Sequence, residues 1–177
     1  MTFMVTPEMI LARLPPYRDE WELITNRQYV PDIIREVCEA HKLFGWLYDR
    51  FSDLFYNPDP MKVADNLYDF CREYLRYKEE PVKTQTTSLP TGIIERGYLT
   101  GPGVDCKHYS LFCAGVIGSL NRMYNCSFDA VFMFVGYGRA TEPYHVFVCV
   151  KDKEVNIWID PTPGSGGTPS IVQEKRV

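Results

Sequence analysis

The sequence predicts an α+β fold in which helices come first and an antiparallel sheet follows. Apolar residues recur with a helical period over the first 80 residues, and a stretch rich in turn residues then continues to residue 104. One further helix is followed by short β-rich runs, an order typical of α+β proteins. With 177 residues, 45% of them hydrophobic, the chain suits one domain and can bury a substantial core.

Two long helices are expected in the first 80 residues. Pro31 suits the first turn of a helix whose apolar residues recur between positions 33 and 55. We expect Gly45 to weaken this helix without ending it. Asp59 and Pro60 then have the positions of the N-cap and first residue of a second helix.

The second half of the chain is expected to contain one helix and three strands. Residues 79–104 are predicted to be a loop, and residues 105–121 a helix with Asp105 as its N-cap. Three runs are predicted to be antiparallel strands: 128–138, 143–151 and 155–160. The end of the chain, 164–177, is rich in Gly, Ser and Pro, and we expect an extended or mobile tail.

Composition excludes several classes of function. The net charge of −4 provides no basic stripe for phosphate groups, so we expect no direct nucleic-acid partner. The six cysteines have neither a C-x-x-C spacing nor paired Cys/His spacings, so we expect no metal ion and no cofactor. We also expect reduced thiols, because the chain is longer than the small secreted scaffolds that need disulfides.

The sequence contains neither a secretory signal pattern nor a membrane span. The N-terminus lacks a basic region followed by a sustained apolar run, and no apolar stretch reaches the roughly 18 to 20 residues that span a bilayer. We therefore expect no membrane partner and a cytoplasmic location, unless a particle carries the protein elsewhere.

Cys106 stands where a Gly/Pro-rich turn gives way to a helix, in the run "GPGVDCKHYSLFCAGVIGSL". If Asp105 caps the helix, the Cys106 sulfur lies beside the positive end of the helix dipole, which stabilises a thiolate. Cys113, in the apolar part of the same run, lacks this environment. A small buried hydrophobe explains Cys106 almost as well, so a catalytic role requires a general base within reach.

Only three histidines are available as that base. His41 lies between charged neighbours, where we expect a solvated helix face. His108 follows Cys106 by two positions, about 200° around the helix, so the two side chains are expected to point to different sides. His145 stands at the entry of a predicted strand, where its ring can face a cleft.

Strand register connects His145 with Asp160. If the last two predicted strands form a hairpin around residues 151–154, Val150 faces Val155, and His145 lies directly opposite Asp160. The Cβ atoms of opposed residues are roughly 4.5 to 5.5 Å apart, so a carboxylate can hold the imidazole. A register shift of one residue would put them on opposite faces. Taken singly, each residue has a simpler interpretation. His145 could be a surface residue of a strand, and Asp160 could be a turn residue before Pro161.

The stretches "GVDCKHYSLFCAGVI", "YHVFVCV" and "WIDPT", in this order, resemble the transglutaminase-like superfamily of cysteine acyl-transfer enzymes. The resemblance covers about residues 77–163 and implies a papain-like core, in which the helix carrying the cysteine packs on an antiparallel sheet. It implies Cys106 as nucleophile, His145 as general base and acid, and Asp160 as the group that orients His145.

Around this core we expect a helical N-terminal segment over residues 1–76, packed on the core, and the tail over residues 164–177. Two departures from the family pattern leave the substrate open. Lys107 stands where many members have an acidic or small residue, and "YHVFV" lacks the "H-x-W" of many bacterial members. The pairing of "GVDCK" with an upstream "QTTSLP" also resembles members encoded by bacteriophages and mobile elements, which implies partners among phage structural proteins and a place in the virion.

The predicted chemistry is thiol acyl transfer on an amide or peptide bond of a protein or peptide. Hydrolysis, by a protease or amidase, is favoured over cross-linking, because no second pocket for an amine is evident. Backbone N–H groups at the helix start would hold the oxyanion, with Gln85 as candidate side-chain donor, although a solvated loop amide is its simpler interpretation. Tyr98, Tyr109 and Tyr144 could line the cleft or simply pack. The alternative function is a non-catalytic structural or assembly protein, for example a virion component, that keeps the fold.

Overall fold

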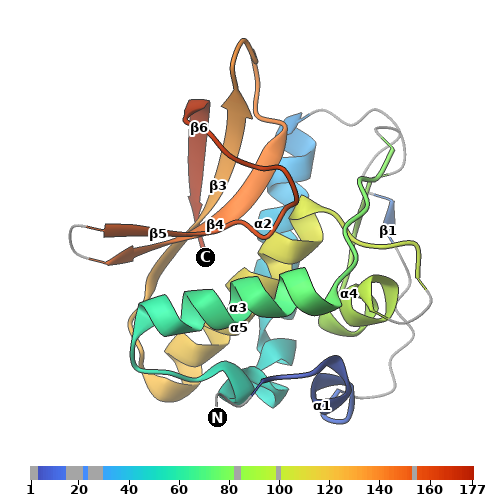
Figure 1. The fold of residues 1–177 in the computed structure, drawn as a ribbon, viewed down its shortest axis with the longest axis vertical. Helices are drawn as coiled ribbons and strands as arrows, with labels where there is room; N and C mark the ends of the chain where they lie inside the picture. The colour runs from blue at the N-terminus through green and yellow to red at the C-terminus, as the bar shows by residue number, and fades with distance from the viewer. Residues whose placement is uncertain (1–3, 15–21, 24–29, 82–84, 99–100, 153–154) are drawn as a thin grey trace.

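The protein has an α+β fold, as the sequence predicts, with a helical part followed by an antiparallel sheet (Figure 1). The computed structural model describes residues 4–14, 22–23, 30–81, 85–98, 101–152 and 155–177. The helices are α1 (Pro7–Leu11), α2 (Val30–Phe44), the 3-10 helices η1 (Gly45–Arg50) and η2 (Ser52–Phe55), α3 (Pro60–Tyr74), α4 (Pro90–Gly97) and α5 (Cys106–Tyr124). The strands are β1 (Glu22–Leu23), β2 (Thr86–Thr87), β3 (Asp129–Tyr137), β4 (His145–Asp152), β5 (Val155–Ile159) and β6 (Pro169–Arg176). Among the described helices, none is long and apolar enough to cross a membrane.

The main sheet has four antiparallel strands in the order β5-β4-β3-β6. The last strand, β6, lies where we expected an extended or mobile tail: the segment is extended, but it pairs with β3 from Val131↔Arg176 to Tyr137↔Pro169. This pairing satisfies the backbone N–H and C=O groups on the free edge of β3. The glycines of the preceding turn, Gly164 and Gly167, have positive φ values of 77° and 101°. The many glycines of this segment predicted a tail and masked the sequence signal of the strand that follows.

Helix α5 lies at the centre of the molecule, between the sheet and the other helices (Figure 1). It begins where the sequence predicts, because Asp105 caps it: Asp105 Oδ1 accepts a hydrogen bond from Lys107 N at 3.1 Å. The helix packs against β3 and β4 on one side and against α2 and η1 on others. It ends at Tyr124, and the C-cap residue Asn125 has a left-handed φ of 52°, as at many helix ends.

Two local predictions about the helices are wrong. The α-helix that begins at Val30 ends at Phe44, and a 3-10 helix begins at Gly45, so this glycine does end the helix. The Gly45 carbonyl oxygen accepts a hydrogen bond from Arg122 Nη2 at 2.8 Å, which supports the change of helix type. The predicted loop over residues 79–104 contains α4, which is short and buries only two large apolar side chains, too few to produce a periodic pattern.

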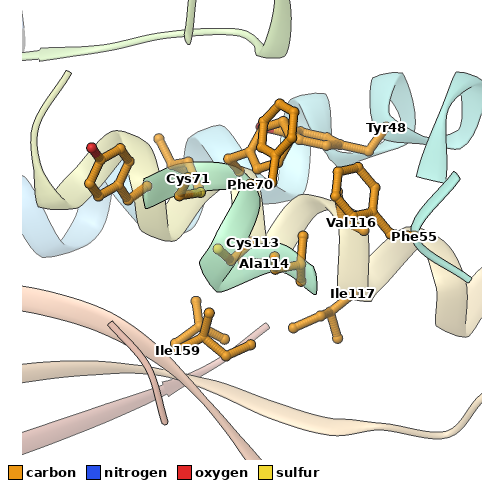
Figure 2. Packing of buried hydrophobic residues seen from close by; sticks show 14 of the residues in the cluster. Tyr48, Phe55, Phe70, Cys71, Cys113, Ala114, Val116, Ile117 and Ile159 are labelled. Carbon is orange, nitrogen blue, oxygen red and sulfur yellow. The ribbon is translucent and has the colours of Figure 1, made fainter. Parts of the chain in front are cut away.

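The N-terminal helices and the sheet share one hydrophobic core (Figure 2). Phe112 of α5 is fully buried and stacks on Phe70 of α3, with ring centroids 5.1 Å apart. Cys113, on the same helix, is also fully buried. Ile159 of β5 contributes to the cluster from the sheet side. The helices therefore pack on the part of the chain that holds α5 and the sheet, while the domain boundaries at residues 76 and 163 stay predictions.

Candidate active site

Cys106 is the first residue of α5, and its side chain is half-buried. Because α5 is 19 residues long and begins at this residue, the thiol lies at the positive end of a full-length helix dipole. The other half of its surface faces two cavities, both of which are also lined by His145. The described structure thus brings the predicted nucleophile and the predicted base to one cleft.

His145 and Asp160 are hydrogen-bonded, as the sequence predicts. The distance from His145 Nε2 to Asp160 Oδ2 is 2.8 Å, and His145 is only 9% exposed. His145 opens β4, while Asp160 directly follows β5. The second carboxylate oxygen, Asp160 Oδ1, accepts a hydrogen bond from Thr162 N at 3.2 Å, which fixes the orientation of the carboxylate.

The strand register that led to this pair is different from the predicted one. Val150 pairs with Ile157 instead of Val155, and Asp152 pairs with Val155. The strands continue further toward the turn than expected, and its centre, residues 153–154, lies outside the described residues. A shift of two residues keeps every side chain on its predicted face. His145 is therefore diagonal to Asp160 instead of directly opposite, and still within reach of it.

The electrostatics of the site favour a protonated His145. Burial by itself lowers the pKa of this histidine, but the hydrogen bond with Asp160, together with a hydrogen bond with Cys106 and the negative charge on its sulfur, raises it to about 10. Burial conversely raises the pKa of Asp160, but its hydrogen bond with His145 and the charge of that ring lower it overall. His145 is thus an imidazolium at neutral pH, hydrogen-bonded to the carboxylate of Asp160 at the cleft that Cys106 also lines.

Neither of the other two histidines serves Cys106. The ring of His108 is fully buried, and its Nδ1 lies 2.9 Å from Asp105 Oδ1, on the capping side of the helix, as expected from the helical angle. His41 was expected on a solvated face but is half-buried, with its ring edge-on to Phe132. Burial, assisted by the charge of Arg122, lowers the pKa of His41 to about 4. The charged neighbours in sequence concealed this packing, because they point to another side of α2.

A buried polar cluster around Lys107 lies beside the nucleophile and was not predicted. Lys107 is only 3% exposed, and its ammonium group donates hydrogen bonds to Asp105 Oδ2, to Gln85 Oε1 at 2.6 Å and to Glu80 Oε2 at 3.4 Å. Glu80 also pairs with Arg96 Nη2 at 3.1 Å. Burial lowers the pKa of Lys107, but the nearby negative charges, that of Asp105 first, raise it overall. The ammonium therefore keeps its charge and ties the loop before β2 to the start of α5.

Three members of this region have the spacing of a metal site. Ligand atoms of Glu80, Asp105 and His108 all lie within 4.8 Å of one another. Lys107 Nζ, however, already bonds both carboxylates, so the chain itself supplies the positive charge that a metal ion would bring. These contacts explain the close spacing of the two carboxylates without a metal ion.

Gln85 lines the same two cavities as Cys106, as expected for a residue in a loop that runs past the cleft. Its Nε2 donates hydrogen bonds to the carbonyl oxygens of Glu80 at 3.0 Å and Pro81 at 3.4 Å, and its Oε1 accepts from Lys107. The amide hydrogens thus point to the backbone of their own loop. A role as oxyanion donor stays a prediction and would require the amide to turn.

The cleft contains two tyrosines that the sequence pattern does not single out. Tyr77 and Tyr137 line a cavity of about 340 Å³ at Cys106, together with Tyr144, which we did name. Tyr109, the other candidate near α5, packs in the core instead, and its hydroxyl donates to Leu75 O at 2.6 Å. Nothing in the local sequence distinguishes Tyr77 or Tyr137, because the pairing of β3 with β4 and the path of the chain before α4 bring them to the cleft.

Comparison of the chain with protein-family models, with curated proteins and with solved structures finds no match. The chemistry of the site therefore has to be argued from the side chains that meet at Cys106.

Proposed function

We propose that this protein is a cysteine-dependent acyl-transfer enzyme with a transglutaminase-like, papain-like core that hydrolyses an amide or peptide bond. The single observation that supports this most is the order of contacts at the cleft. Cys106 at the start of α5 lines the same cleft as His145, and His145 Nε2 lies 2.8 Å from Asp160 Oδ2. A nucleophile, a base and a group that orients the base are the parts that covalent acyl transfer requires.

The reaction would begin from the thiolate and imidazolium pair. The Cys106 sulfur attacks the carbonyl carbon and forms a C–S bond, and the tetrahedral intermediate then loses its amine as the C–N bond breaks. His145 gives its proton to the departing amine. A water molecule next attacks the thioester while His145 takes one of its protons, and the carboxylic acid leaves as the thiolate re-forms. Asp160 holds the ring of His145 in position throughout.

The oxyanion of both intermediates would be held at the start of α5. The first N–H groups of a helix have no intrahelical partners, and that of Cys106 is adjacent to the reacting sulfur. The helix dipole adds a favourable field at the same point. Gln85 is the candidate for a second donor if its amide turns from its own loop toward the substrate.

The acyl acceptor is the less constrained part of the proposal. We favoured hydrolysis because the sequence suggested no second pocket for an amine, yet two cavities flank Cys106. Water reaches the thioester through either of them, and it needs no recognition, so hydrolysis remains the proposed outcome. A protein or peptide is the proposed substrate, and the resemblance to phage-encoded members extends the proposal to a place in a virus particle or its assembly.

Alkylation by iodoacetamide tests the proposal against the alternative of a non-catalytic structural protein. The rate at Cys106, followed by mass spectrometry of the modified peptide, is expected to stay high well below the ordinary thiol pKa of about 8.5. The His145→Ala variant is expected to react more slowly at neutral pH. The half-buried Cys126 provides an internal control, because burial raises its pKa. A Cys106 that reacts no faster than the same peptide unfolded would contradict the enzyme hypothesis.

A further inference from the structure

We propose that α2 forms one wall of a specificity pocket, which holds an apolar side chain of the acyl part of a polypeptide substrate beside Cys106. The inference rests on the proposed acyl-transfer function and goes beyond it, because it assigns a substrate class and gives the N-terminal helical segment a role. The first 76 residues lie outside the family resemblance, yet part of them reaches the cleft.

The pocket is a cavity of about 280 Å³ that opens beside the thiol. Its apolar lining comes from three elements and one connection: Val30, Ile33 and Ile34 of α2, Phe134 of β3, Val146 of β4, and Pro143 before β4. Cys106 and His145 line the same cavity. Val30 and Ile33 are half-buried, so they keep apolar surface that a ligand can cover. An apolar wall this close to the nucleophile favours an apolar group next to the reacting carbonyl.

Charge and size restrict what the pocket can hold. Its one lysine, Lys107, is already paired with carboxylates, whereas Glu79 and Glu142 are exposed at its edge. An acidic side chain would therefore meet negative charge without a free cation to balance it. The volume lies just below the roughly 300 to 1,000 Å³ of small-molecule pockets, so it suits one side chain better than a cofactor.

A second, larger cavity lies beside this pocket. This cavity of about 530 Å³ shares Val30, Ile34 and Pro143 with the pocket and extends between α2 and β6, where Gln173 and Lys175 line it. A polypeptide that places one side chain in the pocket could place a neighbouring residue in this second cavity. The occupant that fits both cavities is an extended polypeptide rather than an isolated amino-acid amide.

The other cavity at Cys106 has a more polar lining, and this difference indicates which part of the substrate lies where. It is lined by the tyrosines Tyr77 and Tyr137 and by the hydroxyl-bearing residues Thr162 and Ser165. The amine must leave and water must enter while the acyl part stays bound as a thioester. Groups that hydrogen-bond suit the side that exchanges amine for water, and the apolar pocket suits the side that retains its ligand. The apolar side chain is therefore assigned to the acyl part.

Peptidyl chloromethyl ketones test this assignment because they need only a reactive thiol. Alkylation of Cys106 by short peptides that end in leucine, alanine or aspartate before the ketone is compared, with iodoacetamide as the probe that has no side chain. One methylene group in an apolar pocket changes discrimination by roughly 10-fold or more. We expect the leucine reagent to react at least about 10-fold faster than the alanine reagent, and the aspartate reagent to be the slowest.

Substitutions in α2 test whether the preference for leucine comes from the proposed pocket. Ile33→Trp fills the pocket and is expected to reduce the leucine rate by about 10-fold or more while leaving the iodoacetamide rate within about 2-fold. Leu43→Trp places the same side chain at an exposed position near the other end of the helix and is the matched control. Circular dichroism spectra establish that both variants are folded.

The outcomes separate the two proposals. Equal rates for the leucine and alanine reagents, or an equal effect of Ile33→Trp and Leu43→Trp, overturn the pocket assignment while rapid iodoacetamide alkylation still supports the enzyme. An unreactive Cys106 with every reagent overturns both.

Discussion

Two charged groups of residues flank Cys106, and they differ in whether their charge can change. On one side His145 and Asp160 form a pair whose proton can move, at the edge of a cleft. On the other side Lys107 is held by Asp105 and Glu80 in the interior, with its ammonium charge secured. The difference indicates a division of labour, in which the first pair performs the proposed chemistry and the second fixes the helix start that carries the nucleophile.

The largest effect on reactivity is expected from neutralising Asp160, the carboxylate that orients His145. Asp160→Asn keeps the size of the side chain but removes the charge that helps to raise the pKa of His145. The rate of any hydrolysis is expected to fall by about 10² to 10⁴-fold, the range of general acid and base contributions, and Cys106 alkylation at neutral pH is expected to slow as well. A variant as reactive as the wild type would show that the pair does not act on Cys106.

Removing the charge of Lys107 is expected to affect mainly the stability of the fold. Lys107→Met removes the ammonium that pairs with both buried carboxylates and leaves Glu80 with Arg96 alone. The variant is expected to cost about 3 to 5 kcal/mol in the free energy of unfolding, measured by urea denaturation. Lys62→Met, at an exposed position of α3, is the control and is expected to change it by about 0.5 kcal/mol or less. Equal stability of the two variants would remove Lys107 from its structural role.

The two cysteines of α5, Cys106 and Cys113, are expected to differ in their contributions to stability and reactivity. Cys113→Ser places a hydroxyl in the fully buried core and is expected to cost about 1 to 3 kcal/mol in the free energy of unfolding. Cys106→Ser, at the half-buried cleft, is expected to cost less while abolishing alkylation at this position. The opposite order of stabilities would mean that Cys106 is the structural cysteine.

A pH dependence of stability is also predicted, and it distinguishes the His145–Asp160 pair from the Lys107 cluster. His145 has its pKa raised to about 10, so its stabilising contribution is complete below about 6.5 and is lost as the pH rises toward 10. The difference in unfolding free energy between the wild type and His145→Gln is therefore expected to shrink over this interval. Lys107, whose pKa is raised from 10.5, should contribute equally across it. A difference that grows with pH would contradict this assignment.

The sequence predicts the first group much better than the second, and the reason is geometric. His145 and Asp160 belong to one hairpin, and side chains alternate between faces, so even a register wrong by two residues brings them together. Glu80 pairs with Lys107 and with Arg96, and the turns and short helix that bring these residues together show no periodic pattern. The wall that α2 adds to the cleft was hidden for the same reason, since a helix pattern predicts a buried face without saying what it covers.

Strand β6 is a second element that the sequence pattern did not predict. Its residues are mostly exposed, so they show no strong alternation, and the Gly-rich turn before it dominated the interpretation. The strand exists because β3 offers it a free edge, and such a partner is visible only in three dimensions.

Titration of the His145 ring by NMR tests the central claim most directly. The account predicts that His145 keeps its proton to about pH 10 in the wild type, and that the midpoint falls in Asp160→Asn and in Cys106→Ser, because each variant removes one of the negative charges that face the ring. A wild-type midpoint at or below the ordinary histidine value of about 6.5, unchanged in both variants, would contradict it.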